Sequence, residues 1–386
     1  MAEEASVFAA GAPEDTAPAV AAVSSTTLAI AGLMVDIYGL AELPATATSI
    51  SCLWLHHPRL KKKEDMAETA NLALSAHNHR QQQTSSSSSS NNPRGLIAVA
   101  FDQRNHGTRE VDSRANQSWN RGNATHAQDM LGTVSGTVSD TVHLIDVLEG
   151  HLFGAGDGPG ALPTPSPLPA GGDGAGDAEA SQRQSRRRQI DQHLVLGISL
   201  GGHSTWQLLF ADPRVTAGVI VIGCPDYMRL LKDRARKSKL PTYTGDEGAS
   251  FLGSKDFPEA LVRACQKYDP KGILFGAGEV APIPTTAAEH ERLRPLLDAK
   301  VRGKRFQILS GGADKLVPYA VATPFLEFFK DAVDTWYRDG DVYVEDNVYA
   351  GVGHAFDIAM KKDAVRFIVD TVALADEKNK GASAKI

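Results

Sequence analysis

Short hydrophobic runs alternate along the chain with segments whose apolar residues recur at helical spacing. The runs, several of them rich in β-branched residues, predict buried strands at residues 49–56, 95–102, 193–197, 215–223, 305–310 and 342–349. Helical spacing predicts helices at residues 66–77, 125–152, 201–211, 320–336 and 363–376. Continuous apolar strands that alternate with helices are typical of a mainly parallel sheet covered on both faces. The pattern therefore predicts a three-layer α/β domain, and the first fifty residues are expected to add one or two leading strands.

Two low-complexity segments interrupt this pattern. Residues 81–93 contain a run of glutamines and serines, and residues 153–188 are rich in Gly, Pro and Ala and end in arginines. Neither composition can bury enough apolar surface to offset the entropy lost on ordering, so both are predicted to be flexible inserts. The acidic, proline-broken residues 1–25 are expected to form a disordered leader. A single α/β domain is then expected over residues 26–386.

Composition and charge exclude several classes of protein. The 386 residues are 42% hydrophobic, and the formal net charge of −6 argues against a general nucleic-acid binder, which would carry a dominant basic face. No segment approaches the roughly 18 apolar residues of a membrane span. The N-terminus lacks the basic start and continuous apolar run of a secretory signal, so a cytoplasmic protein is expected. The three cysteines, Cys52, Cys224 and Cys265, show no CxxC spacing, so neither a disulfide framework nor a metal site is expected.

The stretch HLVLGISLGGHSTWQLLFA carries the clearest chemical signal. A predicted strand runs into Gly197-Ile198-Ser199-Leu200-Gly201, and a predicted helix begins at once. A G-x-S-x-G sequence between a strand and a helix is the nucleophile elbow, a strained turn that lifts its serine above the edge of the sheet. The glycines are needed because side chains at their positions would collide with the neighbouring strand and helix. Ser199 is therefore the candidate nucleophile.

A serine hydroxyl needs a base to take its proton, and that base needs an acid to orient it. In elbow-containing hydrolases the partners follow in the order Ser, acid, His, on loops after later strands. Asp314 comes just beyond a predicted strand, and His354 lies in a glycine-flanked loop before the last helix. Asp226, just after an earlier strand, remains open as an alternative acid. His203, on the elbow helix, is expected to be structural.

The motifs GISLGG, FDQRNHG, GGADKLVP and GVGHAF together resemble the α/β-hydrolase superfamily, in particular its esterase-like members. The resemblance extends from about residue 50 to the C-terminal helix, outside the two inserts. It implies a Ser–His–Asp triad of Ser199, His354 and Asp314, an acyl-enzyme mechanism, and no metal or organic cofactor. It also implies that the FDQRNHG turn shapes the floor of the site and tethers loops, with Asp102, Arg104 and His106 in structural roles.

The oxyanion hole departs from the pattern of this family. It requires backbone N–H groups about 3 Å from the oxygen of the tetrahedral intermediate, and Leu200 is expected to supply one of them. The second usually comes from an H-G-x loop, which LHHPR matches here, but Pro58 has no N–H and His57 replaces the glycine. The His57 backbone is therefore the expected second donor, with Arg59 as the fallback. A side chain at His57 or Arg59 is also expected to enter the site.

Residues 226–304 are more than a simple crossover needs, so they predict a small helical cap over the site. Within them, YMRLLKDRARKSK and FPEALVRACQKYD are predicted helices. The first helix carries a basic cluster, made up of Lys232, Arg234, Arg236, Lys237 and Lys239. Such a cluster either attracts an anionic substrate or forms a solvated face, and its spread around the helix favours the solvated face.

These features predict a serine hydrolase that cleaves a small-molecule carboxylic ester. Fold and triad do not select the leaving group or the acceptor, so a peptidase, thioesterase or acyltransferase with the same triad remains an alternative. A hydrolase-fold binding protein without turnover is a further alternative from a different class. Loss of turnover usually removes a triad residue, and the sequence retains all three.

Overall fold

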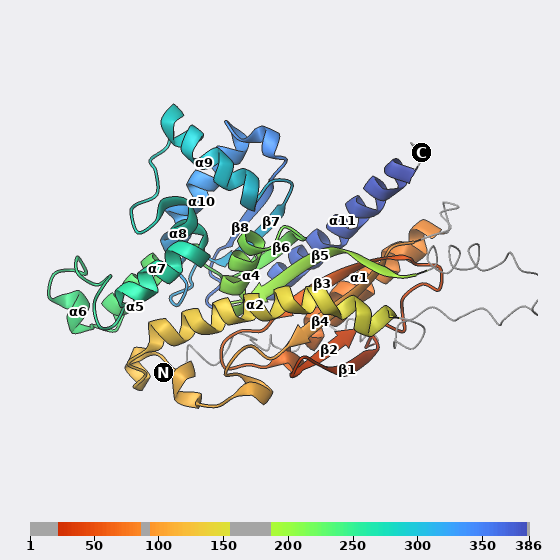
Figure 1. Ribbon diagram of the computed structural model, residues 1–386, viewed down its shortest axis with the longest axis horizontal. Helices are drawn as coiled ribbons and strands as arrows, with labels where there is room; N and C mark the ends of the chain where they lie inside the picture. Colours follow the sequence, from red (N-terminus) through yellow and green to blue (C-terminus); the bar gives the residue numbers. More distant parts are fainter. Residues whose placement is uncertain (1–21, 86–92, 155–186, 384–386) are drawn as a thin grey trace, which may run out of the picture.

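The computed structural model describes residues 22–85, 93–154 and 187–383 (Figure 1). Most of the expected leader and of the two low-complexity inserts lies outside these described residues. The inserts are bounded by described chain at Ser85 and Pro93, and at Gly154 and Arg187. The predictions made for residues 86–92 and 155–186 therefore remain predictions, whereas residues 81–85 of the first insert belong to a helix.

Eight strands form one sheet in the order β1-β2-β4-β3-β5-β6-β7-β8. They are β1 (Ser25–Ile30), β2 (Leu33–Tyr38), β3 (Ser49–His56), β4 (Gly95–Phe101), β5 (Gln189–Ile198), β6 (Val215–Val221), β7 (Arg305–Gly311) and β8 (Tyr343–Tyr349). β1 and β2 pair antiparallel, β2 pairs antiparallel with β4, and all the later pairs are parallel. The mainly parallel sheet is confirmed, with two leading strands at its antiparallel end.

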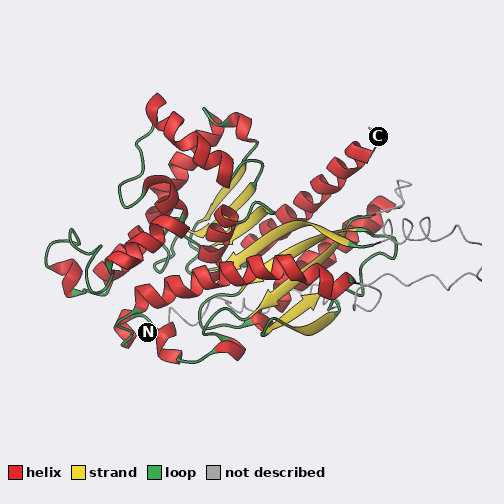
Figure 2. Ribbon diagram, in the orientation of Figure 1, coloured by secondary structure: helices red, strands yellow, loops and turns green. Residues whose placement is uncertain are grey.

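Helices cover both faces of the sheet and complete three layers (Figure 2). One face carries α1 (Ala67–Ser85) and α11 (Ile358–Ser383), and the other carries α2 (His126–Phe153), α4 (Leu200–Ala211) and α10 (Tyr319–Asp334). Successive strand residues point to opposite faces, so the sheet supplies side chains to two separate cores. On β3, for example, Trp54 belongs to the core under α2 and α4, and Leu53 to the core under α1 and α11.

Two helices extend beyond their predicted limits. α1 continues through the glutamines to Ser85, and α11 begins at Ile358, five residues before its predicted start. Glutamine is a good helix former, so a polar run can continue a helix that hydrophobic spacing alone would end earlier.

The described helices do not include one that combines the length and apolar character needed to span a bilayer.

The predicted cap region is helical. It contains α5 (Tyr227–Lys237), α6 (Pro241–Thr244), α7 (Glu259–Tyr268), α8 (Pro270–Phe275) and α9 (Ala287–Lys300). Figure 1 shows these helices grouped beyond one end of the sheet. Three short turns of 3-10 helix lie between β4 and α2, and one of them places Trp119 edge-on to Phe251 of this helical region, with ring centroids 6.3 Å apart. The loop between β4 and α2 therefore packs against the helical region after β6.

Candidate active site

Ser199 occupies the sharp turn between β5 and α4. Its backbone has φ 55° and ψ −109°, a left-handed conformation that is strained for a residue with a side chain. A Cβ at Gly197 would lie 2.0 Å from the carbonyl oxygen of Gly201, and one at Gly201 would lie 2.1 Å from that of His56. Only glycine fits at either position, because the strand packs against the first turn of α4 at Gly197 and α4 packs against the end of β3 at Gly201.

Three side chains from separate loops form a continuous hydrogen-bonded chain. The Ser199 Oγ lies 2.8 Å from His354 Nε2, and His354 Nδ1 lies 2.7 Å from Asp314 Oδ2. Asp314 follows β7 and His354 follows β8, so these parallel neighbours deliver both groups to the same edge of the sheet. The Asp314 side chain is fully buried, and only 8% of the His354 side chain is exposed.

The surroundings of Asp314 favour its ionised form. Burial alone would raise the pKa of this carboxyl, but the hydrogen bond and charge of His354 and two backbone N–H groups, of Val317 and Leu316, hold it below the usual value. An ionised carboxylate can only accept, so the His354 Nδ1 carries a proton and donates a hydrogen bond to Asp314. The Nε2 atom is then left as an acceptor for the hydroxyl of Ser199.

Asp226, the alternative acid, lies elsewhere. Its side chain caps the N-terminus of α5, where Oδ1 accepts the backbone N–H of Arg229 at 3.0 Å. Burial raises the pKa of its carboxyl, against the opposing charge of Lys271. The structure therefore brings Asp314, and not Asp226, to His354.

The loop expected to supply the second oxyanion donor runs beside the elbow. His56, the last residue of β3, pairs with Gly197 of β5, so His57 follows next to the nucleophile turn. The His57 ring, however, is buried, and its Nδ1 donates to the carbonyl of Pro58 at 2.8 Å while Nε2 accepts the N–H of Gln103 at 3.0 Å. The expectation that this side chain enters the site is wrong, because the ring is buried and its two nitrogens are bound to the backbone of Pro58 and of Gln103, which follows β4. Burial lowers the pKa of His57 to about 4, which keeps the ring neutral.

Gln103 fixes this loop and was not recognised from the sequence. Its side-chain amide donates to the carbonyl of His57, and its Oε1 accepts the hydroxyl of Thr137 on α2 at 3.1 Å. Gln103 is fully buried, so these contacts hold the backbone at His57 from the side of α2. The available signal was an amide two residues after an apolar strand, within the FDQRNHG motif.

Those neighbours tie loops together, as the resemblance implies. Asp102 accepts the backbone N–H groups of Lys63 at 2.9 Å and Thr108 at 2.8 Å. Arg104 forms an ion pair with Asp140 on α2 at 3.0 Å. The buried His106 bonds through Nδ1 to the Arg104 carbonyl at 3.0 Å.

The side chain of Arg59, the fallback oxyanion donor, is bound to another loop. Its Nη1 donates to the carbonyl of Asn116 at 2.9 Å, in the loop between β4 and α2. The guanidinium therefore holds that loop against the end of β3.

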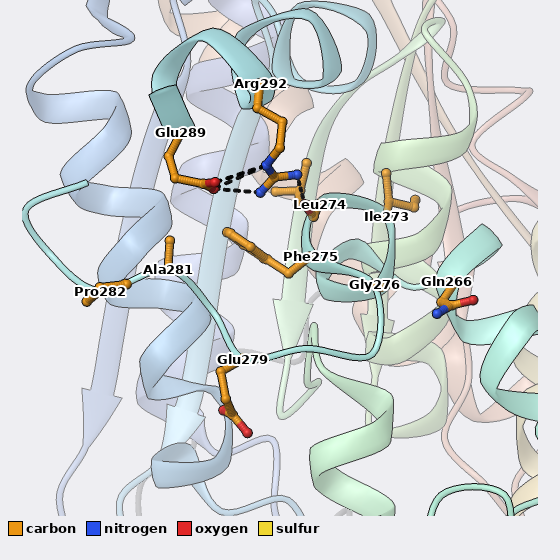
Figure 3. Close-up of a pocket in the computed structure, with 11 residues that line it drawn as sticks. Gln266, Ile273, Leu274, Phe275, Gly276, Glu279, Ala281, Pro282, Glu289 and Arg292 are labelled. Atoms are coloured by element: carbon orange, nitrogen blue, oxygen red, sulfur yellow. Dashed lines mark hydrogen bonds and ion pairs between the residues drawn. The ribbon is translucent and has the colours of Figure 1, made fainter. Parts of the chain in front are cut away.

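A surface hollow of about 510 Å³ lies in the helical region rather than at the elbow (Figure 3). Residues of α7, α8 and α9 line it, and the Arg292 guanidinium bonds there to Glu289 and to the carbonyl of Leu274. The same guanidinium lies 5.6 Å from the centroid of the Phe275 ring. None of the predicted site residues lines this hollow.

No family model and no curated protein matches the sequence. Solved structures of similar shape include TT1662 from Thermus thermophilus, at 18% identity over 91% of this chain and 98% of that one, with a TM-score of 0.47. Acetyl xylan esterase 1 from Thermoanaerobacterium sp. JW/SL YS485 has 12% identity over 92% and 86%, with a TM-score of 0.44. The acylaminoacyl peptidase of Pyrococcus horikoshii has 13% identity over 92% and 41%, with a TM-score of 0.39.

Likeness at these identities assigns no activity to this chain. The fold itself can be read from the chain's own features, namely the strand order, the parallel central strands and the strained serine between β5 and α4. The chain therefore has the α/β-hydrolase fold.

Proposed function

We propose that the protein is a serine hydrolase that cleaves a carboxylic ester through an acyl-enzyme on Ser199. The observation that carries the proposal is the hydrogen-bonded chain from Ser199 through His354 to Asp314, with heavy-atom distances of 2.8 and 2.7 Å. These distances lie within the range required between a nucleophile, its base and the group that orients the base. Asp314 is the acid in this proposal.

Each side chain has a defined part in the reaction. As the Ser199 Oγ attacks the carbonyl carbon of the ester, His354 Nε2 takes its proton, and Asp314 stabilises the imidazolium that forms. His354 then gives this proton to the departing alkoxide, which leaves the acyl group on Ser199. A water molecule, deprotonated by His354, attacks the acyl carbon, and the acid is released as Ser199 recovers its proton.

The oxyanion of each tetrahedral intermediate is assigned to the backbone N–H groups of Leu200 and His57. Leu200 is the first residue of α4, where the helix N-terminus favours negative charge. His57 lies beside it because β3 and β5 are neighbours, and Gln103 holds its backbone. Donors fixed in this way need no reorganisation when charge develops.

The test is labelling with a fluorophosphonate, which reacts with activated serines, followed by mass spectrometry of the peptides. We expect a single labelled residue, Ser199, and hydrolysis of short p-nitrophenyl esters that Ser199→Ala lowers by about six orders of magnitude in kcat. Ser204→Ala, five residues further along α4, is the matched control and should keep both labelling and turnover within an order of magnitude. Normal turnover by a folded Ser199→Ala protein would overturn the proposal.

A further inference from the structure

The basic cluster of α5 divides into two parts. Arg236 and Lys237 form ion pairs with Asp233 at 2.7 and 2.6 Å on the outer side of the helix. Arg234 instead turns inward, and its Nη1 lies 3.3 Å from Nε2 of His126, at the start of α2. One arginine of the cluster is therefore directed into the molecule, whereas its neighbours form the expected solvated face.

His126 is a neutral acceptor for this arginine. Its Nδ1 donates to the carbonyl of Gln117 at 2.9 Å, which leaves Nε2 free of a proton and able to accept from Arg234. Burial, and after it the charges of Arg234 and Arg59, hold the pKa of His126 well below its ordinary value. Two guanidinium groups, from α5 and from the loop after β3, thus lie close to the same buried imidazole.

His203 supplies a further donor between this arginine and the triad. It lies one turn after Ser199 on α4, and its Nδ1 accepts the backbone N–H of Cys224 at 3.0 Å, a shorter contact than the 3.3 Å to the Cys224 carbonyl. The proton of the neutral ring is therefore on Nε2, and burial lowers the pKa of His203 to about 3. This Nε2–H is buried and has no hydrogen-bond partner within the described residues.

The neighbours of His203 indicate where that donor lies. The charge of Arg234 acts on the His203 ring, and so do those of His354 and Asp314. The hydrogen bonds of His203 place it between the start of α5 and the nucleophile, because its ring accepts from Cys224, two residues before the N-cap Asp226, and its backbone N–H donates to the Ser199 carbonyl at 3.0 Å. A buried donor without a partner is costly, and a ligand that accepts from it would remove that cost.

We infer that Arg234 and the Nε2–H of His203 form a subsite beside Ser199 for a negatively charged group of the substrate, so that the enzyme prefers anionic esters such as the monoesters of dicarboxylic acids. A carboxylate can accept from a guanidinium and an imidazole N–H together, and charge-assisted hydrogen bonds of this kind are roughly twice as strong as neutral ones. Arg59 adds to the positive potential that attracts the anion. The inference rests on the proposed function and specifies its substrate class.

The experiment compares matched esters on the full-length protein. Mono-p-nitrophenyl adipate carries the charge on its acyl half, and its neutral match has an isopropyl group in place of the free carboxylate. A second pair carries the charge on the leaving group, as hexanoate esters of 4-hydroxybenzoate and of its methyl ester. We expect wild-type kcat/KM to favour the anionic member of at least one pair by about tenfold or more, and added salt to reduce that preference.

Variants assign the preference to the subsite. Arg234→Gln should lower the ratio of kcat/KM for the anionic ester to that for its neutral match by about tenfold. Arg236→Gln, on the outer side of the same helix, should leave the ratio unchanged. If the protein cleaves neutral esters but shows no anionic preference, or one that Arg234→Gln does not reduce, the subsite is wrong and the proposed function stands. If it cleaves none of the esters, the proposed function fails and the subsite fails with it.

Discussion

Asp314 and Asp226 follow neighbouring parallel strands, β7 and β6, at the same edge of the sheet. Both are buried: counted over the whole residue, backbone included, 6% of Asp314 and 4% of Asp226 is exposed. Their pKa values nevertheless move in opposite directions, downward for Asp314 and upward for Asp226. Burial raises both, so the difference comes from what each carboxylate contacts.

The contacts of the two carboxylates are of unequal strength. Asp314 accepts hydrogen bonds from His354 and from two backbone N–H groups, which together outweigh the cost of burial. Asp226 accepts one backbone N–H, and this bond together with the charges of Lys271 and Arg229 does not outweigh burial, which raises the pKa of its carboxyl. A position after a parallel strand brings an aspartate to the edge where ligands bind, but its partners decide whether it can serve a base.

The largest effect that tests this contrast is expected from Asp314→Asn. The amide keeps the shape of the side chain but removes the charge that orients His354 and stabilises its protonated form. We expect kcat for p-nitrophenyl esters to fall by about four orders of magnitude, or ~5 kcal/mol in the barrier. The melting temperature, measured in parallel, separates this loss from unfolding. A loss below tenfold in a folded protein would remove Asp314 from the triad.

Asp226→Asn should have a much smaller effect on turnover. Asparagine is as good an N-cap as aspartate, so α5 should keep its first turn, and His354 keeps its own acid. We expect kcat to change by about tenfold or less, measured with the same ester. If Asp226→Asn shows the large loss of kcat and Asp314→Asn the small one, the acid assignment is wrong, although the assignments of Ser199 and His354 would stand.

The smallest expected effect is a difference in how stability depends on pH. The folded-state pKa of Asp314 is lowered, so its contribution to stability is present above about pH 4 and is lost as the pH falls through the folded value. The folded-state pKa of Asp226 is raised, so its contribution is present below about pH 4 and is lost as the pH rises through the folded value.

Urea unfolding of the wild type and both asparagine variants at a series of pH values measures this difference. With increasing pH, the stability of the wild type relative to Asp314→Asn should rise, and its stability relative to Asp226→Asn should fall. Slopes of the same sign for the two variants would contradict the contrast between the two carboxyl groups.

The central strands could be predicted closely from the sequence. β3, β4 and β6 are buried on both faces, so each appears as an unbroken apolar run, and each predicted start agrees with the observed one. β1, at the edge of the sheet, alternates exposed and partly buried residues, so the sequence indicated leading strands without fixing their bounds. The elbow was recognisable because its glycines, serine and flanking elements are all local.

The partners of the site depend on tertiary contacts that spacing does not reveal. Asp226 and Asp314 look equivalent in sequence, since each follows a strand, and only the packing of the loops after β7 and β8 brings one of them to His354. The direction of the His57 ring depends in the same way on Gln103, which is 46 residues away. Arg234 had a readable signal: it lies four and three residues after the buried Leu230 and Leu231, at the border of the apolar stripe of α5.

The described chain stops at Ser85 and Gly154 and resumes just before β4 and β5, at the edge of the sheet where these strands begin. Ser199 follows the opposite end of β5, and the 10 residues of that strand span about 30 Å. Both junctions therefore lie far from the triad along the sheet, and a change in chain length there should leave the geometry of Ser199, His354 and Asp314 unchanged. For an engineer, the same two junctions are suitable places to insert a reporter domain.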